Sequence, residues 1–382
     1  MRFSSRALSL AESETLRLSN AVARLRGEGR DIIGLLEGEP DLPVPEAVVR
    51  AVEAALRAGR TKYSSSSGLA ELKAVIVRKL DGDNGVRTAP ENILVTNGAK
   101  QAIYEVLQAL CDPGDEVLIP APCWVTFPEA VKLSGARPVL VPTGDDHQPV
   151  IDALAAAVTS RTRAIILNTP NNPTGAVYPE TALRAIAGLA EKHDLTIIAD
   201  EAYEGLVYEG RHVSLASLGE AAAKRTVTVQ TCSKSFAMTG FRVGYAAGPA
   251  ELIKNAARIH GHVTGNVCTF AQYGAIAALG LTEHRGPWRA AHEKRRDVAW
   301  ELAAKLFSGV KPQGGLFVFA DARMHLGSRF QDSAALASHL LEKGNVAVVP
   351  GSAFGREGYL RLSFSAPEDV LREGFSRMTN VL

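Results

Sequence analysis

Residues 164–200 read AIILNTPNNPTGAVYPETALRAIAGLAEKHDLTIIAD, and this stretch decides the fold. Two short apolar runs, 164–167 and 196–199, lie on either side of a helical pattern at 180–193. The apolar residues of that pattern share one helix face, as a period of about 3.6 residues requires. They are Leu183, Ile186, Leu189 and Ala190. A strand, a helix and a second strand in this order predict a parallel β-α-β unit.

Similar short runs recur on both sides of this unit, at 93–96, 116–120, 226–231 and 242–247. Helical patterns separate most of them. We therefore expect an α/β fold with a mainly parallel central sheet and helices on both of its faces. In such sheets, ligands bind beyond the carboxyl ends of the strands.

The two ends of the chain have a different texture. Residues 1–45 contain a polar helix followed by a stretch rich in glycine and proline, and a charged helix is expected at 292–307. Short strands follow at 316–320, 346–349 and 359–364. This arrangement predicts a large domain at 46–285 and a smaller α+β domain made of 1–45 together with 286–382.

Composition limits the kinds of partner. The 382 residues include 42 basic and 41 acidic side chains, so a formal charge of +1 does not favour nucleic acid or an acidic membrane surface. A small molecule is the expected partner. No apolar run is long enough to span a bilayer, and no His/Cys cluster has the spacing of metal ligands. The cysteines are widely separated, which favours reduced thiols and a cytoplasmic location. They are Cys111, Cys123, Cys232 and Cys268.

Polar clusters follow three of the expected strands, at 168–175, 200–203 and 233–235. Each has an ordinary explanation when taken alone: the first suits a turn, the second supplies acids to a helix start, and the third carries a solvated lysine. Since parallel strands end at the same sheet edge, the clusters are expected to lie together. Their coincidence favours a binding site.

With these clusters, an ordered series of motifs runs along nearly the whole chain. It resembles the class I, fold-type I aminotransferases, most of all the branch that contains bacterial aspartate aminotransferases. The resemblance implies a pyridoxal-phosphate-dependent transferase. The motifs are Gly38-Glu39-Pro40-Asp41, Tyr63 to Gly68, Thr96 to Lys100, Pro120 to Trp124, Asn171 to Gly175, Asp200 with Tyr203, Ser233-Lys234-Ser235, Thr239 to Gly244 and Tyr359 to Phe364.

The resemblance implies three catalytic residues. Lys234 would hold pyridoxal phosphate covalently and then move the proton of the substrate, since desolvation can lower the pKa of a lysine amine. Asp200 would face the pyridine nitrogen and keep it protonated. Tyr203, together with Asn172, would bond the phenolic oxygen, and Trp124 would stack on the ring.

The phosphate of the cofactor is also assigned by resemblance. Gly98, Ala99 and Lys100 would open a helix whose amides bind phosphate, with Arg242 supplying a positive charge. Two hydroxyl residues, Thr231 and Ser233, would add contacts, although hydroxyls at a strand end are often only part of a polar edge.

Substrate and subunit contacts complete the implied site. Arg361 would clamp the α-carboxylate, because a planar guanidinium suits a carboxylate, although a strand arginine is often only solvated. Gly38 would let the substrate approach the backbone, and Trp124 and Asn172 would contact the substrate as well as the cofactor. Tyr63, and with it Asn266, would reach the site of a neighbouring subunit, which implies a homodimer with active sites at the interface.

The expected reaction is a ping-pong transfer between an L-amino acid, with an aspartate-like donor favoured, and a 2-oxo acid such as 2-oxoglutarate. Cys123 and Phe241 stand where relatives often carry other aromatic residues, and no cation for the distal carboxylate of aspartate is evident. Aromatic, aliphatic or basic donors therefore stay open, as does a C–S β-lyase on the same fold. A nicotinamide dehydrogenase is disfavoured because GxGxxG is absent after the first strands. A non-catalytic module is disfavoured because Lys234 and Asp200 are both present.

Overall fold

The computed structural model describes all 382 residues and contains a seven-stranded sheet in the order β2-β8-β7-β6-β5-β3-β4. Only β8 runs against the other strands, so the expectation of a mainly parallel sheet is confirmed. The strands are β2 (Ile93–Thr96), β3 (Glu116–Ala121), β4 (Arg137–Pro142), β5 (Thr162–Asn168), β6 (Thr196–Asp200), β7 (Thr226–Thr231) and β8 (Gly244–Ala247).

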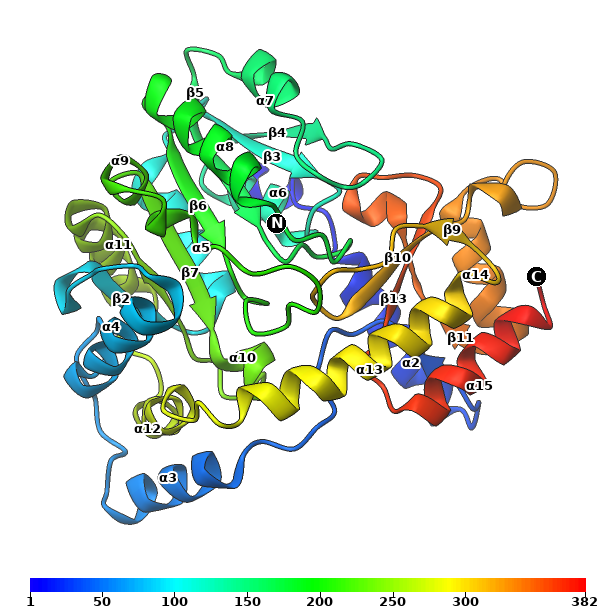
Figure 1. Ribbon diagram of the computed structural model, residues 1–382, viewed down its shortest axis with the longest axis horizontal. Coiled ribbons are helices and arrows are strands. Elements are labelled where there is room, and N and C mark those ends of the chain that lie inside the picture. Colours follow the sequence, from blue (N-terminus) through cyan, green and yellow to red (C-terminus); the bar gives the residue numbers. More distant parts are fainter.

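Helices cover both faces of this sheet (Figure 1). Strand β5 explains the two layers, because Ala164 and Ile166 enter one core while Ile165 and Leu167 enter the other. On the first face lie α5 (Ala99–Leu110), α6 (Thr126–Leu133) and α11 (Ala250–Val263). On the second lie α4 (Ala70–Asn84), α7 (Ile151–Ala157), α8 (Glu180–Lys192), α9 (Glu220–Ala223) and α12 (Thr269–Leu279), with α3 (Glu46–Arg57) packed on α12.

A smaller α+β part is built from the two chain ends. Its four-stranded sheet has the order β12-β13-β10-β9, and β1 pairs with β11 beside it. The strands are β1 (Ile33–Gly34), β9 (Ser308–Gly309), β10 (Phe317–Asp321), β11 (Val346–Ala347), β12 (Val349–Pro350) and β13 (Tyr359–Ser363). Around them lie α2 (Glu14–Gly27), α13 (Arg285–Ala303), α14 (Ser333–Gly344) and α15 (Glu368–Thr379).

Helix α13 runs from the larger part, near α10 (Cys232–Ser235) and α12, to the smaller part, where it packs on α15 (Figure 1). The cores of the two parts meet, because Tyr203 and Leu206 share a cluster with Leu316 and Phe317. The domain boundaries at 45/46 and 285/286 stay a prediction. No helix is both long enough and apolar enough to cross a membrane. The remaining short helices are α1 (Ser5–Leu8), Pro90–Asn92, Leu215–Ser217, Arg323–His325 and Gly351–Phe354.

Some expected elements differ from the structure. The strand expected at 242–247 begins at Gly244, because Arg242 has a φ of 54° and leaves the extended region. The helix expected at 292–307 spans 285–303 instead. Strand β4 was not expected, since Pro138 and Pro142 argue against a strand; it is an edge strand, where proline is tolerated.

Candidate active site

A cavity of about 240 Å³ lies at the carboxyl ends of β5, β6 and β7. The register pairs Asn168 with Asp200, so the polar clusters after these strands do meet at one edge. The cavity brings together most of the residues singled out from the sequence. They are Gly38, Ala99, Lys100, Trp124, Asn172, Asp200, Tyr203, Thr231, Ser233, Lys234, Arg242 and Arg361. Gly98 and Tyr63 do not line it.

Lys234 belongs to the four-residue helix α10 that follows β7 directly. Its Nζ donates a hydrogen bond to the carbonyl oxygen of Gly38 at 2.8 Å. Burial lowers the pKa of Lys234 to about 8, with the positive charges of Arg242 and Arg361 adding to that effect and Glu39 opposing it. A neutral amine, which can act as a nucleophile and a base, is therefore accessible near neutral pH.

Asp200 ends β6 with its side chain buried, at 4% exposure. Its Oδ1 accepts a hydrogen bond from the Ala202 amide at 3.1 Å, and no side chain donates to it. Burial raises the pKa of Asp200 to about 7, and the neighbouring charge of Glu201 raises it further, whereas Lys234 lowers it. A buried carboxyl group whose pKa is raised in this way lacks a positively charged partner that would stabilise its ionised form.

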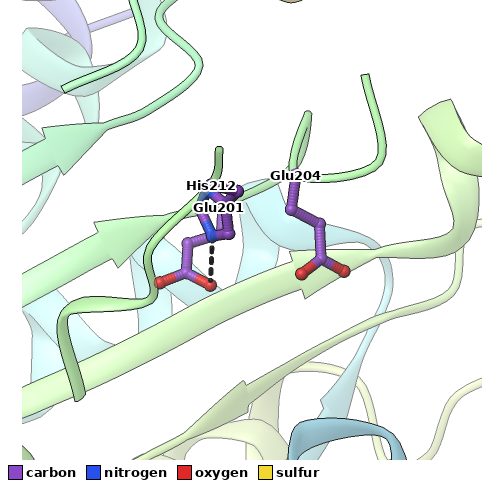
Figure 2. Close-up of side chains that lie close together, drawn as sticks. All are labelled: Glu201, Glu204 and His212. Carbon is purple, nitrogen blue, oxygen red and sulfur yellow. Dashed lines mark ion pairs between the residues drawn. The ribbon is translucent and has the colours of Figure 1, made fainter. Parts of the chain in front are cut away.

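Glu201, the residue after β6, lies near Glu204 and His212 in a separate network (Figure 2). Glu201, Glu204 and His212 offer ligand atoms within 4.8 Å of one another, and His212 pairs with Glu201 at 3.1 Å. The ammonium of Lys79 already contacts Glu204, and it donates to Asn84 at 2.7 Å. Lys79 thus supplies the positive charge that a metal ion would bring, and the group is a charge-balanced ion network.

The loop after β5 is held by its own asparagines. Asn168 donates to the Asp200 carbonyl at 3.0 Å and accepts from the Asn172 amide at 2.7 Å. Asn172 Oδ1 in turn accepts from Arg361 Nη1 at 3.0 Å. Residues from β5, β6 and β13 are therefore linked across the cavity. Burial raises the pKa of Tyr203, whose hydroxyl lies beside Asn172, above its ordinary value.

Helix α5 begins at one end of the cavity, with Gly98 as its N-cap at a φ of 79°. A Cβ at Gly98 would lie 2.5 Å from Arg242 Nη2, so only glycine permits this approach of the guanidinium to the helix start. The first amides of α5 have no acceptor within the helix. Nearby, the hydroxyls of Thr231 and Ser233 lie 2.9 Å apart. This end of the cavity suits an anion.

Trp124 forms a wall of the cavity, and the ammonium of Lys100 lies 5.1 Å from its ring centroid. Burial lowers the pKa of Lys100, and Arg242 lowers it further. The preceding residue, Cys123, is buried and does not line the cavity. All four cysteines are unpaired, and only Cys268 is exposed.

Arg361 projects from β13 and is 3% exposed. Its guanidinium lies between the rings of Phe317 and Phe354, 4.1 Å and 4.7 Å from their centroids. Burial lowers its pKa to about 10, and its Nε has no hydrogen-bond partner. A buried cation with an unused donor suits a carboxylate. Gly38 is required here, because a Cβ would lie 2.4 Å from the Phe317 ring.

Tyr63 lies away from this cavity, with its side chain 96% exposed. It lines a separate hollow of about 450 Å³ with Lys62, Asn266, Cys268 and Phe270. Within one chain, Tyr63 and Asn266 therefore contribute nothing to the site at the sheet edge.

The sequence did not indicate several residues of the cavity. Ser13, Thr15 and Leu16 line it from the start of α2, and Phe317 lines it from β10. Ser13 has the signal of a helix N-cap, but nothing in the sequence indicates that this helix start reaches the cavity. A neighbouring hollow of about 960 Å³ shares Ser13, Lys100 and Arg242.

Comparison with known proteins shows the family of the chain. A family model described as aminotransferase class I and II matches residues 30–378. A probable aspartate/prephenate aminotransferase of Aquifex aeolicus is 42% identical over 99% of this chain and 98% of its own. An aspartate aminotransferase of Bacillus subtilis is 40% identical, with the same coverage. A solved structure titled as aspartate aminotransferase from Thermus thermophilus with maleate superposes with a TM-score of 0.96 and 39% identity over 100% of both chains.

Proposed function

The chain belongs to the class I and II aminotransferase family and is an aminotransferase, and from that premise we propose its substrates, cofactor and residue roles. An aspartate-like L-amino acid donates its amino group, and a 2-oxo acid such as 2-oxoglutarate accepts it. The reaction is ping-pong, since the donor must leave as a 2-oxo acid before the acceptor enters the same cavity. The observation that carries the proposal is that Lys234, Asp200 and Arg361 line one cavity.

The cavity fits pyridoxal phosphate. Asp200 lacks a charged partner, which the protonated nitrogen of the cofactor ring would supply. The α5 amides and Arg242 suit its phosphate. When bound, the cofactor supplies a ring that takes up the electrons left on the substrate Cα. The other contacts proposed for the cofactor come from the backbone of Gly98, Ala99 and Lys100 and from the side chains of Trp124, Asn172, Tyr203, Thr231 and Ser233.

Lys234 is proposed as the residue that holds the cofactor covalently and, once released, moves the proton of the substrate Cα. Its lowered pKa, about 8, supports both roles because each needs a neutral amine. When the Lys234 amine is not bonded to the cofactor, it donates a hydrogen bond to the Gly38 carbonyl oxygen at 2.8 Å. Tyr203 and Asn172 orient the phenolic oxygen of the cofactor.

Two cations of the cavity suit a dicarboxylic substrate. Arg361, with its unused Nε, clamps the α-carboxylate. Lys100 is then the cation available to the distal carboxylate, because Lys234 and Arg242 are committed to the cofactor. This assignment supplies the distal cation that sequence reasoning lacked. It favours aspartate and glutamate over aromatic, aliphatic or basic donors.

The hollow of about 960 Å³ beside the site supports the proposal that the enzyme accepts a second, larger 2-oxo acid. Tyr104 and Val125 line it, so a ring-bearing dicarboxylic 2-oxo acid such as prephenate has room there. Relatives are named for both aspartate and prephenate.

A homodimer with active sites at its interface is also proposed. The exposed Tyr63, in a hollow with Asn266, is available to the site of a partner subunit. A cytoplasmic location is proposed from the unpaired cysteines.

The donor is tested by single-turnover half-reactions, followed by absorbance as the cofactor converts to its amine form. Aspartate and glutamate should convert the cofactor fastest, and Lys100→Met should slow these two donors about tenfold while sparing alanine. A preference for aromatic, aliphatic or basic donors would overturn the proposed donor. Pyruvate and ammonia released without any acceptor would indicate the β-lyase instead.

A further inference from the structure

Helix α13 contacts the main chain of Lys234. The indole Nε1 of Trp288 donates a hydrogen bond to the Lys234 carbonyl oxygen at 3.2 Å, and Trp288 is only 4% exposed. Helix α10 is four residues long, so its last carbonyls have no amide within the helix to bond. No backbone amide elsewhere donates to this carbonyl. Trp288 is therefore the donor that fixes the peptide of Lys234.

The same helix also contacts the loop that receives the lysine amine. Lys234 Nζ donates to Gly38, and Asp41 lies three residues further along that loop. Arg295 forms two hydrogen bonds to the Asp41 carboxylate, one of them at 3.2 Å, and donates to the Ser365 carbonyl at 2.6 Å. Arg295 follows Trp288 by seven residues, two helical turns, so both side chains lie on one face of α13.

A row of ring contacts, one stacked and two tilted, holds the indole in place. Phe236, two residues after Lys234, lies 5.7 Å from the ring of His284 with an angle of 20° between the planes. The ring of Trp288 lies 5.0 Å from His284 and 4.8 Å from His292. His284, the N-cap of α13, is followed at intervals of four residues by Trp288 and His292, so the row of rings runs along the helix. The indole N–H is thereby aimed at Lys234.

We propose that Trp288 and Arg295 are positioning residues for Lys234, acting on its peptide and on the carbonyl that receives its amine. This inference rests on the proposed role of Lys234. Because α13 also packs on β10, which pairs with the strand of Arg361, one helix ties the lysine to the residue proposed to clamp the substrate. The amine therefore keeps its place relative to Arg361 when it is not bonded to the cofactor.

The first test replaces Trp288 by Phe, which keeps an aromatic ring beside His284 and His292 and removes the indole N–H donor. Trp300→Phe is the matched control, because Trp300 lies on the same helix and its indole makes no hydrogen bond. The readout is the rate at which added pyridoxal phosphate attaches covalently to the cofactor-free protein, followed by absorbance. We expect Trp288→Phe to slow attachment roughly tenfold and Trp300→Phe to leave it unchanged.

A second pair of variants keeps the test decisive if Trp288→Phe does not fold. Arg295→Gln should slow attachment and increase the primary isotope effect on kcat with α-deuterated aspartate, while Arg295→Lys should restore part of both. Folded Trp288→Phe and Arg295→Gln proteins with wild-type attachment rates and isotope effects would overturn the inference. If the wild-type protein attaches the cofactor at another lysine, the proposed function fails instead.

Discussion

Asp200 and Glu201 are consecutive buried carboxylates with opposite properties. They are 4% and 1% exposed, and Asp200 lines the cavity whereas Glu201 bonds Ser214 and Gln230 outside it. Burial raises the pKa of Asp200 to about 7. Burial would also raise the pKa of Glu201, but the charge of His212 and hydrogen bonds from His212, Ser214 and Gln230 together lower it.

The difference lies in their partners, since the burial is nearly the same. Glu201 receives hydrogen bonds from Ser214 at 2.7 Å and Gln230 at 3.0 Å, and pairs with His212. Asp200 receives one backbone amide. A partnered buried charge is costly to unpair, whereas an unpartnered one lowers stability until a ligand of opposite charge binds it. The comparison therefore separates a structural carboxylate from a functional one.

The largest expected effect is on catalysis. Asp200→Asn keeps the shape of the side chain but removes the charge that would hold a proton on the cofactor ring. We expect kcat to fall about a thousandfold, measured with aspartate and 2-oxoglutarate. Glu201→Gln should retain most of the wild-type kcat in the folded enzyme. Equal losses of kcat in both variants would contradict the functional difference between Asp200 and Glu201.

For the free energy of unfolding we expect the opposite order, with Glu201→Gln the more destabilising substitution. Glu201→Gln leaves the His212 ring without its carboxylate, so we expect the free energy of unfolding to fall by about 3 kcal/mol in urea titrations. Glu220→Gln is the control, because Glu220 pairs with Lys224 on the surface and should change stability little. A Glu201→Gln protein as stable as this control would mean that the network has no structural role.

Asp200→Asn should stabilise the cofactor-free protein. The folded chain holds the Asp200 proton up to about pH 7, whereas an unfolded carboxyl loses it near pH 4. Between these values the unfolded state binds fewer protons, so stability falls as pH rises. Asparagine avoids that loss, and the variant should gain on the order of 4 kcal/mol at pH 8 and nothing below pH 4. A gain that does not change with pH would contradict this explanation.

The smallest expected effect is that of replacing His212. Burial lowers the pKa of His212, but the charge and hydrogen bond of Glu201 raise it by more. A raised pKa means that the stabilisation is complete below the ordinary value of about 6.5 and is lost as pH rises through the folded value. His212→Gln should therefore cost about 1 kcal/mol below that pH and progressively less above it. Urea titrations across this range test the point, and a difference that stays constant with pH would count against it.

The sequence predicted the elements that carry strong local signals. The short run at 226–231 predicted β7 with its bounds, and the apolar face at 180–193 predicted α8 to within one residue. The polar clusters after β5, β6 and β7 lie at one edge because parallel strands end together. The aminotransferase family and its activity could be predicted because many motifs occur in one order.

Features that depend on distant packing could not be predicted. Ser13 and Thr15 line the cavity because α2 packs against the smaller sheet, and no local pattern encodes that contact. Trp288 looks like any aromatic on a charged helix, yet it bonds the Lys234 carbonyl. The left-handed φ of Arg242 likewise comes from its tertiary setting, since no turn signal marks that residue.

Lys234 is proposed as the covalent anchor of pyridoxal phosphate, and borohydride reduction of the cofactor-loaded enzyme will show which lysine holds the cofactor. The reduced protein is digested, and the peptide that carries the cofactor is identified by mass spectrometry. We expect the cofactor on Lys234, and Lys234→Ala should carry none. Labelling of Lys100 or any other lysine in the wild-type enzyme would contradict the assignment.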